Sequence, residues 1–99
     1  MQSTRRHRSI RPSHPGEVIA DGLKEGGISK VELAKALGIS RNSLYALVSQ
    51  KQGVTAEMAV RLEAAFGSTA ETWLHMQVAH DLWLARSQVD VTKLRRVAA

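Results

Sequence analysis

Residues 32 to 44 read ELAKALGISRNSL, and three of them have the spacing on which the fold depends. Ala34, Gly38 and Leu44 form the pattern A-x-x-x-G-x-x-x-x-x-L. A small alanine lets two helices cross closely, a glycine takes the backbone through a tight turn, and a leucine packs the second helix onto the first. Compatible core positions are Leu33, Leu37, Ile39, Leu47 and Val48. The stretch therefore predicts a helix-turn-helix.

Capping residues and glycines divide the rest of the chain into further short helices. Pro15 suits a first helical position, Thr55 suits an N-cap, and Ser29–Glu32 and Ser68–Glu71 have the capping-box spacing S-x-x-E. We expect five helices, at about residues 15–26, 30–37, 41–49, 56–66 and 69–86, and a short strand or a last helical turn after them. Core positions outside the helix-turn-helix would be Val18, Ile19, Leu23, Ala59, Leu62, Ala65, Phe66, Trp73 and Leu74.

The composition is that of a single domain with basic ends. The chain has 99 residues, a net charge of +5 and no cysteine, which excludes disulfides and thiolate zinc sites. No apolar run approaches the roughly 18 residues of a membrane span, so we expect a cytoplasmic protein with no membrane partner. Residues 1–14 are rich in arginine and contain no acidic residue. Basic arms of this kind often contact nucleic acid. We expect a flexible basic arm over residues 1–13, a domain over 14–86 and a tail over 87–99.

The predicted third helix would hold a polar face away from the core. In a helix-turn-helix, the N-terminal residues of the second helix point at base edges in the major groove. Arg41 can hold guanine through two hydrogen bonds and Asn42 can hold adenine likewise, so we expect base contacts from both. Helix N-termini favour anions, so the helix before it suits a phosphate. Further contacts to phosphates or base edges are expected from Ser29, Lys30, Ser40, Tyr45, Ser49, Lys51 and Gln52.

The predicted fifth helix carries more apolar side chains than a chain of this length needs to cover. Trp73 and Leu74 would cover the core. Val78, Leu82 and Trp83 lie further along the helix and would form a dimer interface. A two-fold dimer would place two recognition helices about 34 Å apart on double-stranded DNA and would require a palindromic operator.

Four separated blocks of sequence carry a family resemblance. They are HPGE (14–17), ELAKALGISRNSL (32–44), VTAEMAVRLEAAFG (54–67) and ETWLHMQVAHDLW (71–83). In order and spacing they resemble the HigA-type antitoxins of the Xre helix-turn-helix group. The resemblance implies an all-α, five-helix, lambda-repressor-like domain that dimerises, represses its own operon, and binds and neutralises a HigB-type ribonuclease toxin of RelE-like fold. The chain departs from the family at Ser49 and Gln50, where an Asn-Gly pair is usual, and at His80, where tyrosine is frequent.

The sequence leaves two alternatives beside an antitoxin. One is a stand-alone helix-turn-helix repressor without a toxin partner, and the other is a protein-binding adaptor whose helix-turn-helix no longer reads DNA. An enzyme is disfavoured because no phosphate-binding loop or nucleophile motif is present. His75 and His80 are five residues apart and diverge on a helix, so they do not form a metal pair. We therefore expect no catalytic residue, no cofactor and no metal.

Overall fold

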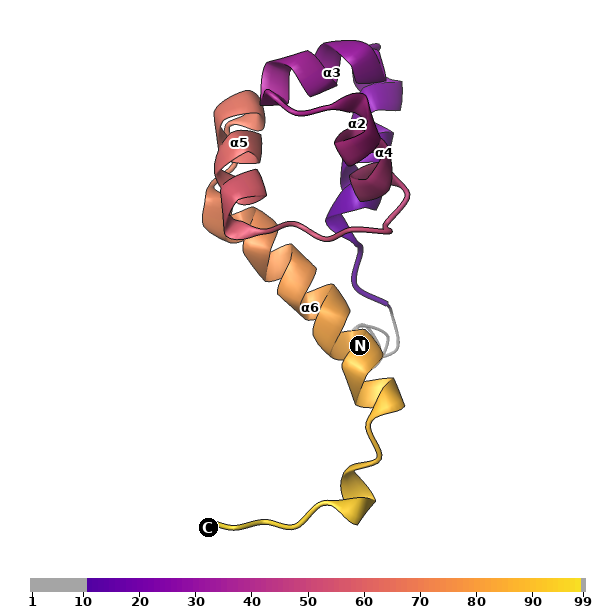
Figure 1. Cartoon of the computed structure of the whole chain (residues 1–99), viewed down its shortest axis with the longest axis vertical. Coiled ribbons are helices and arrows are strands. Elements are labelled where there is room, and N and C mark those ends of the chain that lie inside the picture. The colour runs from indigo at the N-terminus through magenta and orange to yellow at the C-terminus, as the bar shows by residue number, and fades with distance from the viewer. Residues whose placement is uncertain (1–10, 99) are drawn as a thin grey trace, which may run out of the picture.

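The computed structural model describes residues 11–98, and within them the chain is helical with no strand. Four short helices form a compact head, and a long helix runs diagonally away from it toward an extended C-terminal tail (Figure 1). The elements are α2 (Pro15–Gly26), α3 (Lys30–Leu37), α4 (Arg41–Val48), α5 (Ala56–Phe66), α6 (Ala70–Gln88) and the 3-10 turn η1 (Val91–Lys93). The five predicted α-helices are confirmed. Most of the predicted basic arm, residues 1–10, lies outside the described residues.

Side-chain caps set where the helices begin. Ser29 Oγ accepts from the Glu32 amide at 3.1 Å, and Thr55 Oγ1 accepts from the Met58 amide at 3.2 Å, so both predicted caps are confirmed. The predicted Ser68 cap is wrong, because α6 begins one residue later. Thr69 Oγ1 accepts from the Thr72 amide at 3.1 Å. The Glu71 side chain therefore stands too early in the first turn to close a capping box.

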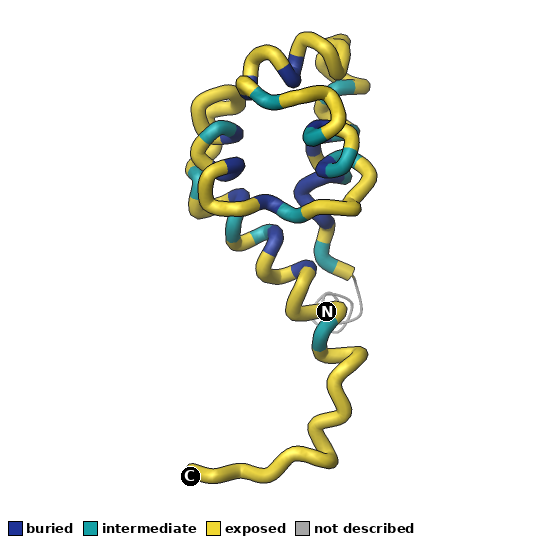
Figure 2. Tube along the Cα trace, viewed as in Figure 1, coloured by how far each residue is buried: buried dark blue, intermediate teal, exposed yellow. Residues whose placement is uncertain are grey.

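The core lies between α2, α3, α4 and α5, and the first turns of α6 close it from one side (Figure 2). All three helix-turn-helix marker residues fall where the spacing predicts: Ala34 and Leu44 are buried, and Gly38 has φ of 70° in the turn. The buried apolar residues are Ile19, Leu33, Ala34, Leu37, Leu44, Leu47, Val54, Met58, Ala59, Leu62 and Trp73.

Three predicted core positions are wrong. Val18 is exposed because the adjacent residue Ile19 occupies the side of α2 that faces the core. Ala65 is exposed as well. Phe66 is the last residue of α5, and its ring tilts over the buried Trp73 ring with the centroids 5.8 Å apart, so its outer side stays open to solvent.

Helix α6 changes character along its length. Trp73, Gln77 and His80 are buried on one face at helical spacing, whereas no residue after His80 is buried within the described chain (Figure 2). The helix continues to Gln88, two residues beyond the predicted end, and η1 then provides the predicted extra turn. No described helix is both long enough and apolar enough to cross a bilayer.

Candidate nucleic-acid interface

Helix α4 has one face in the core and one face in solvent. Leu44 and Leu47 have no exposed surface, while Arg41, Asn42 and Tyr45 are exposed. Neither Arg41 nor Asn42 makes a side-chain hydrogen bond to another residue in the described part of the chain. The structure exposes every residue predicted to contact DNA, namely Ser29, Lys30, Ser40, Arg41, Asn42, Tyr45, Ser49, Lys51 and Gln52.

The turn before α4 is held by bonds from two directions. Ser40 Oγ accepts from the Ser43 amide at 3.0 Å and so fixes the first turn of the helix. Arg61, from α5, donates to the Leu37 carbonyl at 2.8 Å and to the Gly38 carbonyl at 3.2 Å. It also pairs with Glu57 at 2.9 Å. Arg61 thus caps the end of α3, a role that the sequence alone did not indicate because 24 residues separate it from Leu37.

Two predicted DNA contacts from different helices lie together. The Lys30 ammonium stands over the Tyr45 ring, 5.3 Å from its centroid, which is within range of a cation–π attraction. Lys30 is the first residue of α3, and Tyr45 lies in the middle of α4. The start of α3 and the outer face of α4 therefore form one continuous surface.

The end of α4 contains Ser49 and Gln50, where the sequence departs from the proteins that it resembles. The Gln50 amide donates to the Leu47 carbonyl at 3.1 Å and the Lys51 amide donates to the Ala46 carbonyl at 2.9 Å, which is a Schellman motif. Gln50 has φ of 65°, the left-handed position that glycine usually fills. The Gln52 amide also donates to Ala46. Since both backbone amides are engaged, Lys51 and Gln52 have only their side chains free to contact a partner.

The loop after α4 is also fastened to α6. The buried Val54 amide donates to Gln77 Oε1 at 2.8 Å, and Gln77 Nε2 donates to Asp81 Oδ1 at 3.0 Å. Gln77 lies four residues after Trp73, on the same buried face of α6, and its bond to Val54 could not be predicted from the sequence.

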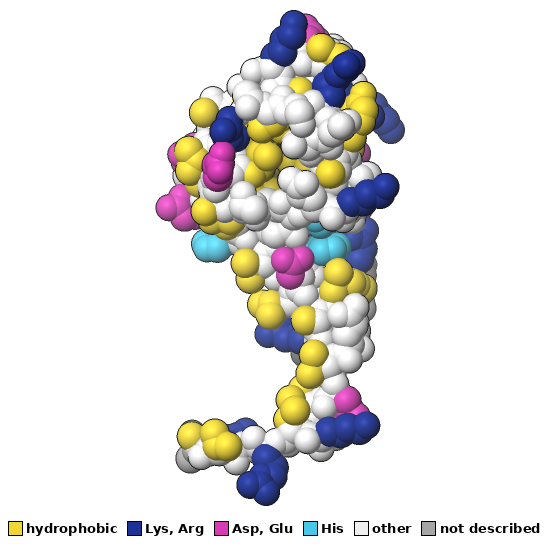
Figure 3. All heavy atoms as spheres, in the orientation of Figure 1, with side chains coloured by type: hydrophobic (Ala, Val, Ile, Leu, Met, Phe, Trp, Pro, Cys, Tyr) yellow, Lys and Arg dark blue, Asp and Glu magenta, His cyan; other side chains and the backbone are white. Residues whose placement is uncertain are grey.

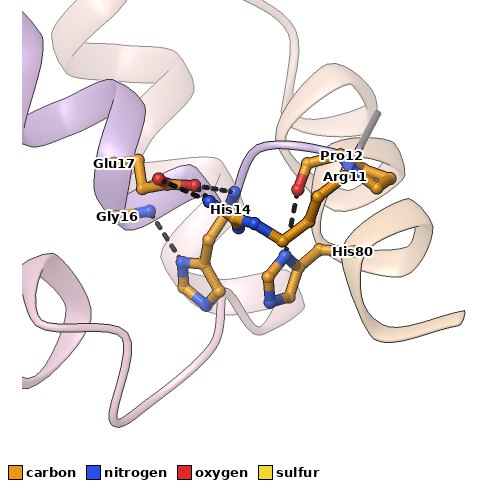
Figure 4. A network of polar contacts seen from close by, with 6 residues as sticks. All are labelled: Arg11, Pro12, His14, Gly16, Glu17 and His80. Carbon is orange, nitrogen blue, oxygen red and sulfur yellow. Dashed lines mark hydrogen bonds and ion pairs between the residues drawn. The ribbon is translucent and has the colours of Figure 1, made fainter. Parts of the chain in front are cut away.

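A polar network joins the start of α2 to α6 (Figure 4). His14 is the N-cap: its Nδ1 accepts from the Gly16 amide at 2.8 Å, and its own amide donates to Glu17 Oε1 at 2.9 Å. Arg11 pairs with Glu17 at 3.0 Å. His14 and Glu17 thus form a capping box at the start of α2.

His80 completes this network from α6. Its Nδ1 lies 3.1 Å from the Pro12 carbonyl, and because a carbonyl only accepts, this nitrogen carries the proton. The His14 and His80 rings meet edge to face with their centroids 4.9 Å apart. The contact ties the residues before α2 to the third turn of α6.

The network lowers two pKa values. The hydrogen bond from Arg11, followed by the one from the His14 amide, lowers the pKa of Glu17 to about 2. Burial lowers the pKa of His14, and the neighbouring His80 lowers it further. At neutral pH, Glu17 is therefore charged and His14 is neutral, the states that the capping bonds require.

The apolar side chains predicted to form the dimer interface lie along α6 from its middle toward its C-terminal end. Val78, Leu82 and Trp83 are all exposed, and Leu84 is exposed beside them. In Figure 3 apolar side chains follow the narrow lower part of the molecule, whereas acidic side chains gather beside the upper head near α5. The molecule therefore has a polar surface at α3 and α4 and an apolar surface at the end of α6.

Comparisons of sequence identify the family. The helix-turn-helix family HTH_3 matches residues 19–74. The chain is 44% identical over 73 residues to virulence-associated protein I of Dichelobacter nodosus, covering 73% of this chain and 68% of that protein. It is 40% identical over 90 residues to antitoxin HigA-1 of Vibrio cholerae, covering 89% of this chain and 80% of that protein.

Solved structures include similar proteins bound to DNA. Antitoxin GraA in complex with its operator superposes with a TM-score of 0.81 at 36% identity, covering 91% of this chain and 95% of that one. Pseudomonas aeruginosa antitoxin HigA with the higBA promoter superposes with a TM-score of 0.77 at 32% identity, covering 89% of this chain and all of that one. The chain thus belongs to the Xre-type helix-turn-helix family that includes the HigA antitoxins, a family of DNA-binding regulators and not of enzymes.

Proposed function

We propose that this protein is the antitoxin of a type II toxin–antitoxin module in the cytoplasm, where it represses its own operon and neutralises a HigB/RelE-like ribonuclease toxin. The observation that carries the DNA-binding part is the outer face of α4, which is polar, exposed and held in place by two fully buried leucines. Similar proteins bound to an operator support the same role. Similarity to proteins named as antitoxins supports the toxin as a partner.

In this proposal the exposed polar residues have separate roles on DNA. Arg41 and Asn42 stand in the first turn of α4 and read base edges in the major groove. Ser40, Tyr45 and Ser49 contact phosphates or base edges. Ser29 and Lys30 bind a phosphate at the start of α3, where the helix dipole favours an anion. Lys51 and Gln52 reach the DNA backbone through their side chains.

We also propose that the molecule is a homodimer that pairs through Val78, Leu82 and Trp83. Successive residues of a helix point about 100° apart, so Leu82, Trp83 and Leu84 present apolar surface on three sides. An exposed cluster of apolar side chains of this kind marks a place where a protein meets a partner. Since α6 projects beyond the head at this point, a second copy can reach these side chains (Figure 1).

The domain division follows from the same argument. Residues 14–86 are the unit proposed to bind DNA and to pair, and residues 1–13 are a basic arm. Within the described part of the tail, from residue 87 onward, no residue is buried. The tail is therefore free to meet another molecule.

DNA binding is tested by fluorescence anisotropy with DNA from the promoter of the gene and with a scrambled duplex. We expect tighter binding to the promoter and an affinity that falls steeply with salt, because phosphate contacts release counterions. A missing or salt-insensitive signal would exclude DNA binding and would favour an adaptor.

The toxin partner is tested separately by co-expression with the neighbouring reading frame. We expect the neighbour to arrest growth when expressed alone, and this chain to relieve the arrest and to co-purify with it. Promoter binding together with a harmless neighbour would contradict the antitoxin assignment and leave the stand-alone repressor.

A further inference from the structure

Gln77 has both ends of its side-chain amide occupied, and only one orientation satisfies them. The Val54 amide must donate, so it faces the oxygen, at 2.8 Å. The Asp81 carboxylate must accept, so it faces the nitrogen, at 3.0 Å. Turning the amide over would break both bonds. Asp81 therefore fixes the direction in which Gln77 presents its oxygen.

The group that Gln77 holds belongs to the loop after α4. Val54 is buried, and its backbone amide donates to a side chain of α6. Gly53 lies directly against the side-chain amide of Gln77. A β-carbon added to Gly53 would stand 2.9 Å from Gln77 Cδ. Because glycine has no side chain, the loop can lie this close to Gln77, and a side chain at position 53 would push the loop and α6 apart.

The loop is thereby fixed at two places, and the residues at the first place have exposed side chains. At its start, the Lys51 and Gln52 amides both donate to the Ala46 carbonyl at the end of α4. At its end, Val54 is held by Gln77, which is only 6% exposed. Lys51 and Gln52 are thus held through their backbone amides, and their side chains are exposed.

We propose that Gln77 is a positioning residue for DNA binding: by holding Val54 it sets the loop so that Lys51 and Gln52 meet the phosphate backbone. The proposal rests on the DNA contacts proposed above for these two residues. It makes α6 part of the DNA-binding machinery, although Gln77 itself touches no DNA. A change in α6 at this turn is transmitted to the end of the recognition helix.

The first test is a double-mutant cycle between Gln77 and Lys51, read by promoter affinity and its salt dependence. Gln77→Met keeps the length of the side chain and removes both bonds, and we expect about tenfold weaker binding of the folded protein. Lys51→Ala should reduce the salt slope by about one in the parent chain and by much less in the Gln77→Met background. A residue that only stabilises the fold would lower the melting temperature and leave the Lys51 effect unchanged.

The second test restores the hydrogen bond between residues 77 and 81 with donor and acceptor exchanged. Gln77→Glu keeps an acceptor for Val54 but places a second carboxylate beside Asp81, which should loosen the loop. Adding Asp81→Asn supplies a donor and removes the repulsion, so the double variant should regain promoter affinity. Amide hydrogen exchange at Val54 should be fast in the single variant and slow in the double variant. This readout needs no DNA and remains available if Gln77→Met fails to fold.

The outcomes separate this proposal from the function on which it rests. Failure of the parent chain to bind its promoter would overturn DNA binding itself. Promoter binding by the parent chain with equal Lys51 effects in both backgrounds would overturn only the role of Gln77. Slow exchange at Val54 in folded Gln77→Met would overturn it as well, because the loop would then be held by other contacts.

Discussion

Helices α4 and α6 both carry one buried face, but what they expose is opposite in character. α4 exposes Arg41, Asn42 and Tyr45 above two buried leucines. The middle and the C-terminal part of α6 expose Val78, Leu82 and Trp83. A polar outer face is stable in water and available for a polar ligand, whereas an apolar outer face lowers its free energy by meeting another apolar surface. The difference indicates two kinds of partner for one small domain.

The two helices also differ in how they are supported. α4 has only eight residues, and it packs against α2 and α3. α6 has 19 residues, and its last turns lie beyond the head. The support of α4 can therefore be broken from inside the domain, whereas the end of α6 can be changed without disturbing the core.

The largest effect is expected where α2 meets α4. A β-carbon on Gly16 would overlap the Leu47 carbonyl, a backbone atom that cannot turn aside. Gly16→Ala should lower the free energy of unfolding by about 1–3 kcal/mol. Gly22→Ala is the matched control in the same helix, because nothing lies near its β-carbon. It should raise stability by about 0.5–1 kcal/mol. Equal effects of both variants in urea denaturation would contradict the close packing of α4 on α2.

The apolar face of α6 can be broken by adding a charge. Val78→Glu should weaken the dimer by at least about tenfold, since pairing would bury an unpaired carboxylate. Val60→Glu on α5 is the matched control, because Val60 is 58% exposed and Val78 is 51% exposed. Sedimentation equilibrium should show dissociation for the first variant alone. A monomeric parent chain, or equal behaviour of the two variants, would contradict pairing through α6.

A smaller effect sharpens the picture of the end of α4. Gln50 has a left-handed backbone, which costs a residue other than glycine roughly 1–2 kcal/mol. Gln50→Gly should raise the free energy of unfolding by about 0.5–1 kcal/mol, because the gain is partly offset by greater freedom in the unfolded chain. Gln52→Gly lacks this gain and serves as the control. A destabilised Gln50→Gly in chemical denaturation would show that the left-handed turn carries no strain here.

The smallest effect concerns pH at the junction of α2 and α6. Because the folded pKa of His14 lies below its usual 6.5, the unfolded chain takes up the proton first, and stability is lost as pH falls below about 6.5. Glu17 adds a second loss as pH falls from 4.5 toward 2. His14→Asn keeps a capping oxygen that does not titrate. In this variant the fall in melting temperature below about pH 6.5 should disappear, and the fall due to Glu17 should remain. If the melting temperature of His14→Asn fell above pH 5 as it does in the parent chain, that fall would come from other groups.

Much of the fold could be predicted from the sequence because its signals are local. Capping serines and glycine turns act over three or four residues, and the spacing from Ala34 to Leu44 lies within one motif. The error at Ser68 arose because Thr69 offers an equivalent hydroxyl one residue later. Phe66 was misplaced because helical spacing does not show where a helix leaves the core.

The candidate site could be predicted less completely, because its supports act over long distances. The sequence placed Arg41 and Asn42 on an outer face, and the structure agrees. It did not show that Arg61 holds the turn before α4 or that Gln77 holds the loop after it, since each bond spans more than 20 residues. The bases that α4 meets and the pairing through α6 stay predictions, because they depend on a second molecule.

The central claim is that the outer face of α4 reads base sequence, and Arg41 tests it most directly. Binding of the parent chain and of Arg41→Ala is measured on the promoter operator and on duplexes that carry each single base-pair change, with Arg86→Ala as the control arginine. We expect Arg41→Ala to lose about 1–3 kcal/mol of operator-binding free energy and to relax the preference at one base pair. An equal loss on operator and random DNA, with every preference kept, would contradict it and reduce Arg41 to a phosphate contact.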